Sequence, residues 1–147
     1  MKIGGIVAEY NPFHNGHKYQ LQKSVETGEL THTVAVMSSN YVQRGEAAIL
    51  SKWARAETAV KNGVDLVIEL PTLWSTSYAQ RFALGAVSLL DALGCVDVLS
   101  FGSEIGNIDE LIACKEAVNS EAVEEKLREN LEIGLGFASA RAEAMRS

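Results

Sequence analysis

The sequence is poor in cysteine and proline, and it contains no long hydrophobic run. Its 147 residues include two cysteines and two prolines. Cys95 and Cys114 lie outside any Cys-x-x-Cys spacing, so we expect two free thiols in a reducing cytoplasm. The longest apolar stretches are far shorter than the roughly 20 residues of a membrane span, and no signal-peptide cleavage site follows the N-terminus. These absences predict a globular cytoplasmic protein without membrane contact.

Positive charge is also scarce. Lys and Arg number 13 against 19 Asp and Glu, and residues 101–147 carry five basic against ten acidic side chains. An acidic region cannot be the main docking surface for nucleic acid, which requires basic residues. If the protein acts on RNA, we expect a local patch or a region beyond this chain to bind most of it.

Four mostly apolar segments are typical of strands buried on both faces of a parallel sheet. They cover residues 2–10, 32–39, 64–70 and 96–102. Helical patterns separate them at residues 17–28, 51–63 and 78–94, and three more follow at 107–119, 120–134 and 139–147. The alternation predicts an α/β fold with a doubly wound parallel sheet. Because no strand follows the last helix, we expect a chain truncated at its C-terminal end.

The segment "AEYNPFHNGHKYQL", residues 8–21, follows the first predicted strand. In open parallel sheets, ligands bind beyond the carboxyl ends of the strands, where the strand order reverses. Pro12 fixes the direction in which the chain leaves the strand. Gly16 has no Cβ to block a ligand. We expect His17 to begin the next helix, whose N-terminus attracts an anion.

His14 and His17 lie about one helical turn apart, so both rings can face one ligand. Two imidazoles over a helix N-terminus can hold phosphate oxygens and stabilise the charge that develops as a phosphoanhydride breaks. Two alternatives stay open. The pair can be solvated or structurally satisfied, or it can belong to a zinc site whose third ligand would be Glu9, because His32 is remote in sequence. The Walker pattern is absent, and "GLGF" at residues 134–137 lacks the third glycine and preceding strand of a dinucleotide motif.

The motif "PFHNGH" resembles the HxGH signature of the nucleotidyltransferase superfamily, whose members attack the α-phosphate of ATP or CTP and release pyrophosphate. More narrowly, "GIVAEYNPFHNGH", "YVQRGEAAILSKWARAETAVKNGVDLVIELP" and "FGSE" resemble the bacterial ATP-dependent tRNA(Met) cytidine acetate ligase family. That family activates acetate to acetyl-adenylate and acetylates the wobble cytidine of elongator tRNA(Met), forming N4-acetylcytidine. Ala47 stands where the family has proline, which we expect to loosen the loop.

The resemblance implies a Rossmann-like HxGH nucleotidyltransferase fold, with residues 1–147 forming one ATP-binding domain. It implies ATP and Mg²⁺ as cofactors, without direct protein ligands to the metal. Acetate and tRNA(Met) would be the substrates, with the tRNA bound mostly beyond this chain. His14 and His17 would be catalytic, on the phosphates. The residues that would line ATP are Val7, Ala8, Glu9, Tyr10, Asn11, Pro12, Phe13, His14, Asn15, Gly16, His17, Lys18, Tyr19, Gln20 and Gly102.

Polar and charged residues after the second predicted strand are further candidates. Fixed cations near a triphosphate would offset its charge, although a solvated loop is the alternative. The candidate phosphate or substrate contacts are Gln43, Arg44, Lys52 and Arg55. At two strand ends, Glu69 and Glu104 can orient Mg²⁺ or acetate-binding groups, or cap helices. Trp53 and Trp74 can stack on bases or pack against the core.

The main hypothesis is therefore ATP-dependent activation of acetate and acetylation of tRNA(Met) cytidine. One alternative is an adenylyl- or cytidylyltransferase acting on a small phosphorylated metabolite, which would share the HxGH site and ignore acetate. Another is a nucleotide-binding module without catalysis. The residues by themselves do not identify the acceptor, because acetate and tRNA come only from the resemblance.

Overall fold

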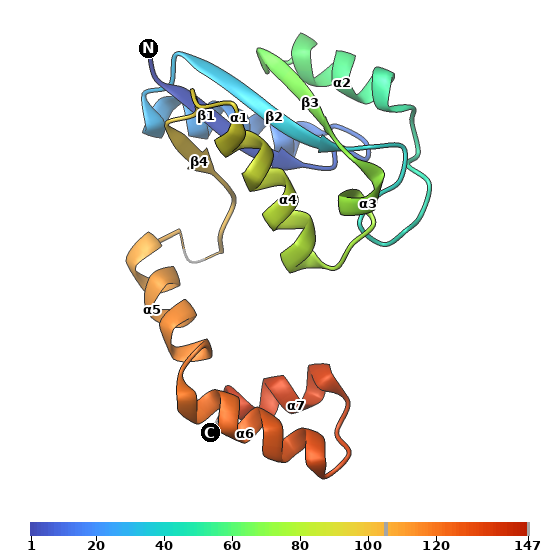
Figure 1. The fold of residues 1–147 in the computed structure, drawn as a ribbon. Helices are drawn as coiled ribbons and strands as arrows, with labels where there is room; N and C mark the ends of the chain where they lie inside the picture. The colour runs from blue at the N-terminus through green and yellow to red at the C-terminus, as the bar shows by residue number, and fades with distance from the viewer. Residues whose placement is uncertain (105, 147) are drawn as a thin grey trace. The chain divides into compact units, whose positions relative to one another are not determined.

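The computed structural model describes residues 1–104 and 106–146 (Figure 1). They fall into two compact units, Met1–Gly102 and Ser103–Ser147. The first unit contains the predicted sheet and the second is helical. That residues 1–147 act as one nucleotidyltransferase-like domain stays a prediction.

The first unit is built on a parallel sheet with strand order β3-β2-β1-β4. Its strands are β1 (Ile3–Ala8), β2 (His32–Ser38), β3 (Leu66–Leu70) and β4 (Val98–Ser100). The chain moves outward from β1 through β2 to β3, then returns to place β4 on the other side of β1. The strand order therefore reverses between β1 and β4, and this confirms the predicted doubly wound sheet.

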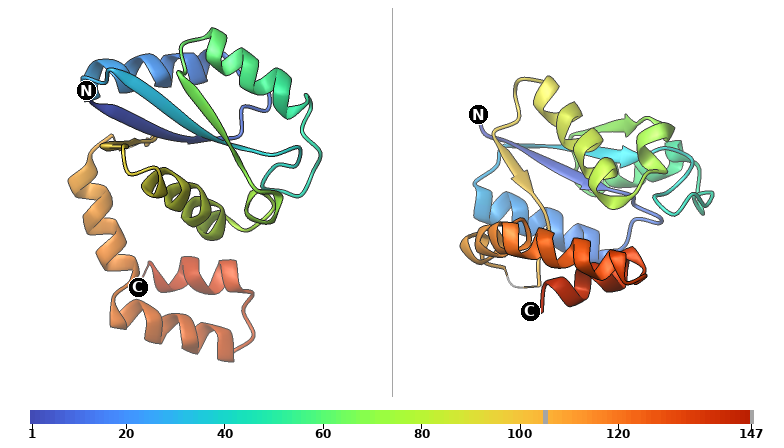
Figure 2. Two further views of the ribbon diagram at one scale, coloured as in Figure 1. Left: turned by 45° about the horizontal axis from the view of Figure 1, so that its top comes forward. Right: turned by 60° about the horizontal axis from the view of Figure 1, so that its bottom comes forward.

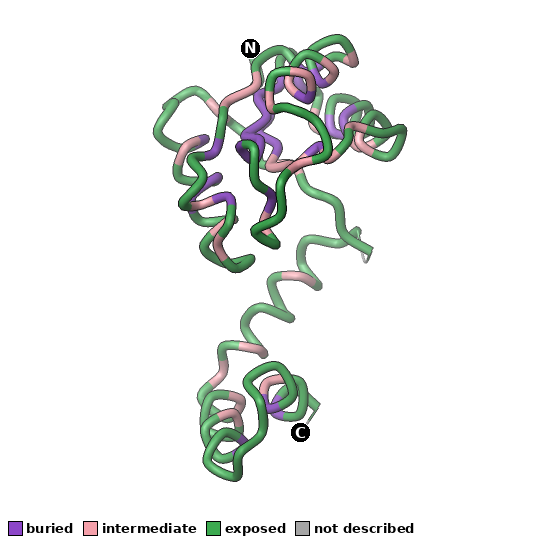
Figure 3. Tube along the Cα trace, turned by 90° about the vertical axis from the view of Figure 1, so that its right-hand side faces the viewer, coloured by how far each residue is buried: buried purple, intermediate pink, exposed green. Residues whose placement is uncertain are grey.

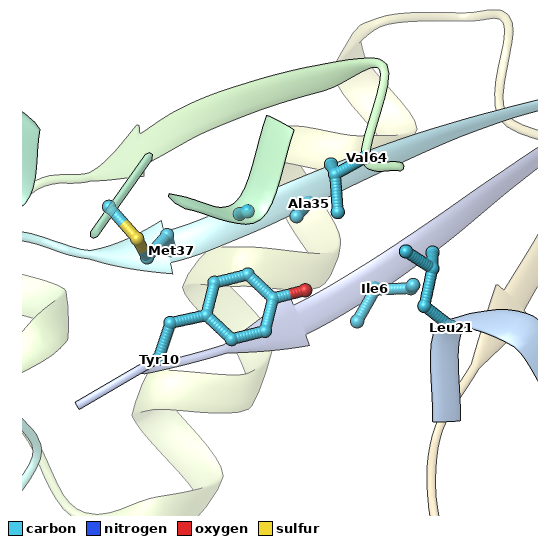
Figure 4. Packing of buried hydrophobic residues seen from close by; sticks show 7 residues of the cluster. Ile6, Tyr10, Leu21, Ala35, Met37 and Val64 are labelled. Atoms are coloured by element: carbon cyan, nitrogen blue, oxygen red, sulfur yellow. The ribbon is translucent and has the colours of Figure 1, made fainter. Parts of the chain in front are cut away.

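Helices cover both faces of this sheet, as Figures 1 and 2 show. On one face lie α1 (Asn15–Gly28) and α2 (Lys52–Lys61), and on the other lies α4 (Ala79–Ala92). Side chains alternate between the faces along each strand, so the core has two parts, and Figure 3 shows buried residues gathered along the strands. The cluster toward α1 and α2, drawn in Figure 4, comprises Ile6, Tyr10, Leu21, Ala35, Met37, Ala59 and Val64. The cluster toward α4 comprises Ile3, Val34, Val36, Leu70, Ala86 and Leu90.

Two aspartates fix where neighbouring strands begin. Asp65 precedes β3, and its Oδ2 accepts hydrogen bonds from the backbone N–H (2.7 Å) and hydroxyl (3.2 Å) of Thr33 in β2. Asp97 precedes β4, and its Oδ2 accepts from the N–H of Ile3 in β1 (2.8 Å). A slip of one residue would turn every side chain of a strand to the other face. The two aspartates therefore help to set the register of the sheet.

The first strand is shorter than predicted, ending at Ala8 rather than residue 10. Tyr10 has φ 48°, a left-handed backbone conformation that a strand cannot contain. Its ring is only 2% exposed and packs in the core. A second difference is α3 (Thr72–Ser75), a single turn after Pro71 that is too short to give a periodic pattern.

The second unit consists of α5 (Ile108–Val118), α6 (Glu121–Glu132) and α7 (Phe137–Ala144), with no strand among its described residues. Ser120 caps α6 through a hydrogen bond from the N–H of Val123. The buried amide of Asn130 in α6 donates to the carbonyl of Ala140 in α7 (3.0 Å). Residue 147, the predicted end of the last helix, lies outside the described residues. In the described parts of the chain, no helix combines the length and apolar character needed to cross a membrane.

Candidate functional site

His14 is the N-cap of α1. Its backbone is extended (φ −137°, ψ 174°), and its Nδ1 accepts a hydrogen bond from the N–H of Gly16 at 3.1 Å. The helix begins at Asn15, so the prediction that His17 begins it was wrong by two residues. The reason is chemical: an imidazole does here what Ser, Thr, Asp or Asn usually does at an N-cap. The usual sequence signal of a helix start was therefore missing.

His17 completes the cap from the third position of the helix. Its Nδ1 accepts from the backbone N–H of His14 at 3.2 Å, so the two histidines form a reciprocal capping box. Their ring centroids lie 3.7 Å apart with planes 21° from parallel, which is a stacked pair. The sequence predicted that both rings could face one ligand, and the structure places them side by side.

These hydrogen bonds determine which ring nitrogens remain available. A neutral imidazole that accepts at Nδ1 carries its proton on Nε2. Desolvation, together with the neighbouring charge of His14, lowers the pKa of His17, so its ring is neutral near pH 7. Each ring therefore keeps its Nε2 available beside the positive end of the helix dipole, an arrangement suited to binding an anion.

The histidine pair is anchored to the core through aromatic contacts. The ring of His17 meets Tyr10 edge-on, with centroids 5.0 Å apart, and lies 5.5 Å from Phe13. Tyr10 and Phe13 are 4.9 Å apart. Figure 4 shows the Tyr10 ring among the core residues of the α1–α2 face. Burial raises the pKa of Tyr10 to about 12, so the phenol is a packing group that stays protonated.

Gly16 is required by the chain's own packing. A Cβ at this position would lie 2.9 Å from Cε1 and 3.0 Å from Nδ1 of His14, closer than side-chain carbons normally come. The sequence suggested that the missing Cβ leaves room for a ligand. The structure gives a different reason, since the missing Cβ leaves room for the His14 ring.

The loop between β2 and α2 is tied to the segment that follows β1. Within the loop, Tyr41 and Ala47 form an antiparallel bridge. The carboxylate of Glu9 accepts from the N–H of Gln43 (2.7 Å), and the amide oxygen of Asn11 accepts from the N–H of Ile49 (2.7 Å). Two of the residues expected to line ATP thus hold residues 40–50 in place.

The loop candidates lie in different surroundings. Arg44 is exposed near the turn at Gly45, which has φ 78°. Gln43 is half-buried and is held by its backbone. The ammonium of Lys52 pairs with the carboxylate of Glu69 at 2.5 Å, so the glutamate binds a cation rather than capping a helix. Of the two cations, Arg44 is therefore the one exposed to solvent.

Arg55 is enclosed by protein groups, contrary to the expectation that it contacts a phosphate or the substrate. Its side chain is fully buried, with 0% exposure. Nε and both terminal nitrogens donate to oxygens of the protein, leaving no donor for a ligand. The signal that could have indicated this was its position, four residues after the N-cap Ser51, on the inward face of α2.

An open cavity of about 310 Å³ lies between α1 and the end of β4. Three of the expected ATP-lining residues gather here, Tyr19, Gln20 and Gly102. A Cβ on Gly102 would meet nothing within 4 Å, so the chain's own packing does not require glycine there. The other residues of the cavity were not predicted from the sequence, although they follow on the same helix and strand end: Lys23, Ser24, Thr27, Ser100 and Phe101.

The remaining expected ATP-lining residues lie at the end of β1, in the segment that follows it and on the first turn of α1. Val7 and Ala8 are half-buried at the end of β1, whereas Asn15 and Lys18 are exposed on the first turn of α1. Pro12 is exposed and follows a cis peptide bond.

The two tryptophans and Glu104 differ in how far they are exposed. Trp53 is 75% exposed, whereas Trp74 is half-buried in the cluster toward α4 and covers Gly85. Glu104 is exposed in the second unit. Among residues 1–104 and 106–146, no group of three or more His, Cys, Asp or Glu side chains is placed to hold a metal ion. The zinc alternative therefore has no support in the described residues.

A parallel sheet whose order reverses beside β1, with a histidine-capped helix at that point, is the arrangement expected of an α/β protein of the nucleotidyltransferase class. The comparison with known families agrees. The chain belongs to the HIGH Nucleotidyl Transferase family, which matches residues 1–147.

Several relatives of the chain carry the name of one particular enzyme of this class. The tRNA(Met) cytidine acetate ligase of Thermoanaerobacter sp. (strain X514) is 53% identical over 143 residues, which are 96% of this chain and 36% of that protein. The ligase of Alkaliphilus metalliredigens is 50% identical over 147 residues, 99% of this chain and 35% of that protein. The crystal structure of Thermotoga maritima TmcAL bound with alpha-thio ATP is similar, with a TM-score of 0.90 and 45% identity. That match covers 99% of this chain and 36% of the other, so the chain spans about a third of the length of its relatives.

Proposed function

We propose that this chain is the ATP-binding part of a tRNA(Met) cytidine acetate ligase. One observation carries the proposal: two stacked imidazoles cap α1 at the point where the strand order reverses, and because both use Nδ1 in the cap, each keeps Nε2 available for phosphate oxygens. The relatives are named tRNA(Met) cytidine acetate ligases and match nearly all of this chain, which supports the assignment to this ligase rather than to the wider class. The cytoplasm, where tRNA and ATP are found together, is the proposed compartment.

In the first step, a carboxylate oxygen of acetate attacks the α-phosphorus of ATP. The new bond forms as the bond to the bridging oxygen breaks, and the electron pair leaves with pyrophosphate. The protein supplies no nucleophile, because acetate already carries the attacking electron pair. His14 and His17 donate hydrogen bonds to the phosphates and stabilise the charge that accumulates on the leaving group.

In the second step, the exocyclic amine of cytidine attacks the acetyl carbonyl, AMP leaves and the amine loses a proton. The Nε2–H donors near the phosphates would also favour the departure of AMP. The chain's net charge of −6 argues against a large RNA surface here, so we place most of the tRNA contacts beyond it.

Mg²⁺ fits this site only as a companion of the nucleotide. Glu9 already accepts from the Gln43 N–H, and Glu69 is paired with Lys52. No group of three possible ligands exists among the described residues. Bound to the triphosphate, Mg²⁺ would shield its charge, while the histidine pair and the helix N-terminus hold the phosphates.

The test replaces each histidine by a residue that preserves the cap. His14→Ser keeps an N-cap acceptor, and His17→Gln keeps the third-position partner of a capping box. Each variant should lower acetate-dependent ATP–pyrophosphate exchange by roughly 100- to 1,000-fold, the usual effect of losing one such donor. His32→Gln, at an exposed histidine of β2, is the matched control and should keep full exchange.

Exchange is measured with the full-length ligase, and ATP binding by calorimetry with this chain. Full exchange in both cap-preserving variants would refute the histidine mechanism. ATP binding without acetate-dependent exchange in the full-length protein would favour a nucleotide-binding module. Incubation with ATP, labelled acetate and tRNA(Met), followed by digestion of the tRNA, tests for acetylcytidine directly.

A further inference from the structure

We propose that Arg55 is a positioning residue for the histidine pair: from inside the protein, its guanidinium fixes both the segment that leads to the pair and the loop that faces it. The inference rests on the proposed function for its consequence on ATP. Arg55 touches neither of the two histidines, and it acts through the backbone groups that it binds.

The hydrogen bonds of Arg55 join three separate parts of the chain. Nη1 donates to the carbonyl of Glu9 after β1 (2.5 Å) and to the hydroxyl of Ser38 at the end of β2 (3.3 Å). Nη2 donates to the carbonyls of Ser38 (3.1 Å) and Ser39. Nε donates to the carbonyl of Leu50, just before α2 (3.1 Å). A single side chain therefore links the ends of two neighbouring strands to the end of the loop.

The carbonyl of Glu9 is the point through which Arg55 reaches the site. It directly precedes Tyr10, whose left-handed backbone (φ 48°) turns the chain out of the strand toward His14. Tyr10 in turn contacts the ring of His17. A shift of the Glu9 carbonyl would therefore move the base on which the stacked rings rest.

The same guanidinium fixes the loop at both ends, because it binds Ser39 just before the loop and Leu50 at its last residue. Glu9 and Asn11 add the two backbone contacts within the loop. The exposed cation of Arg44 lies between these fixed points. Arg55 thus sets the position of the loop relative to the histidine pair.

A buried cation needs a reason, since burial removes it from water at a large cost in free energy. No carboxylate lies within 4.0 Å of the Arg55 guanidinium among the described ion pairs. Its acceptors are carbonyls and one hydroxyl at fixed angles, which suit the planar fork of a guanidinium. A lysine has one tetrahedral nitrogen and cannot reach the same acceptors on three segments.

The decisive variant is Arg55→Lys, which keeps the charge and removes the fork. The matched control is Arg81→Lys on α4, at an exposed arginine outside the site. In the 147-residue chain, NMR of the imidazole nitrogens reads the tautomers of His14 and His17 and the pKa of His17 without any ligand. We expect Arg55→Lys to move the pKa of His17 toward the ordinary value of 6.5. We also expect it to change the tautomer of the two rings, in which Nδ1 accepts a hydrogen bond and Nε2 carries the proton. Arg81→Lys should leave both unchanged.

ATP affinity, measured by calorimetry, gives the second readout. We expect Arg55→Lys to lower it on the order of 100-fold, as displaced binding groups commonly do. Ser38→Ala removes a single acceptor of Arg55 and keeps the core filled, so it should give a smaller loss in the same direction. If Arg55→Lys fails to fold, the histidine spectra and ATP affinity of Ser38→Ala test the proposal instead.

The outcomes separate the two proposals. If the wild-type chain and the full-length ligase bind no ATP, the proposed function fails, while the imidazole spectra still report on Arg55. If the wild type binds ATP and neither Arg55→Lys nor Ser38→Ala changes the histidine spectra or the affinity, the positioning role is overturned. A drop in unfolding temperature alone, with unchanged spectra, also overturns it, because that is what a merely structural residue would show.

Discussion

The imidazole of His14 occupies the space that a methyl group on Gly16 would need, with Cε1 2.9 Å and Nδ1 3.0 Å from the position of that carbon. The ring accepts the Gly16 N–H, so contact and hydrogen bond depend on each other. The glycine of the HxGH motif therefore belongs to the geometry of the first histidine.

The variant Gly16→Ala should separate stability from binding. Alanine favours the helix by about 1 kcal/mol, while displacement of the His14 ring removes a cap of about the same value. We expect a nearly unchanged free energy of unfolding and an exchange rate lowered about 100-fold. Urea unfolding and the pyrophosphate-exchange assay measure the two effects. A fully active variant would show that the ring position is unimportant.

Gly102→Ala probes the proposed approach of the nucleotide to the end of β4. The added methyl group would meet no atom of the protein within 4 Å, so the free energy of unfolding should change by less than about 0.5 kcal/mol. If ATP passes close to this backbone, its affinity should fall by about tenfold or more. Calorimetry of both proteins with ATP provides the measurement, and equal affinities would place the nucleotide elsewhere.

The stability of the protein should decrease in acid because of His17. Its pKa is lowered in the folded state, first by desolvation and then by His14, so the unfolded chain binds the proton more readily. Stability from the neutral ring is therefore complete above the ordinary pKa of 6.5 and is lost as the pH falls through the lowered value. Urea unfolding between about pH 8 and about pH 5 should show this loss.

His17→Gln provides the comparison for this pH effect. Glutamine can take the same capping position and does not titrate, so the variant should lose less stability over the same pH range. Parallel pH profiles for the two proteins would contradict the assignment to His17.

Substitutions at the two tryptophan sites should differ sharply in their effects on the free energy of unfolding. A Cβ on Gly85 would lie 2.6 Å from the ring of Trp74, so Gly85→Ala overpacks the α4 face and should cost about 1–3 kcal/mol. Trp53→Ala, at a ring that is 75% exposed, should stay within about 0.5 kcal/mol. Urea unfolding of both variants checks the contrast. A large loss for Trp53→Ala would mean that the contact of its ring with the Lys52 ammonium, 5.2 Å from the ring centroid, contributes more than we expect at an exposed site.

Much of the fold could be predicted from the sequence because strong local signals agreed. Continuous apolar runs indicated buried parallel strands, and Ser51 at the start of α2 does cap it. The limits of β1 were not predictable, because the turn at Tyr10 depends on a ring that packs into a core assembled from distant segments. The same holds for α3, which is a single turn without periodicity.

The site could be predicted in part for a similar reason. The spacing of His14 and His17 indicated that the rings share a face, but it did not indicate that each ring caps the helix. Arg55 was expected to contact a phosphate or the substrate because a charge near an anion site suggests contact. Its burial depends on acceptors from β1, β2 and the loop before α2, which only the folded chain brings together.

The reciprocal histidine cap also constrains how such a protein can lose its activity over time. Most substitutions at either ring remove a hydrogen bond of the helix as well as the proposed contact with the phosphates, so we expect them to weaken folding and activity together. Only a few replacements, such as serine at the first position or glutamine at the second, separate the two. A screen that scores cellular abundance alone would therefore mark both positions as intolerant to substitution, and it would not reveal their proposed contact with the phosphates.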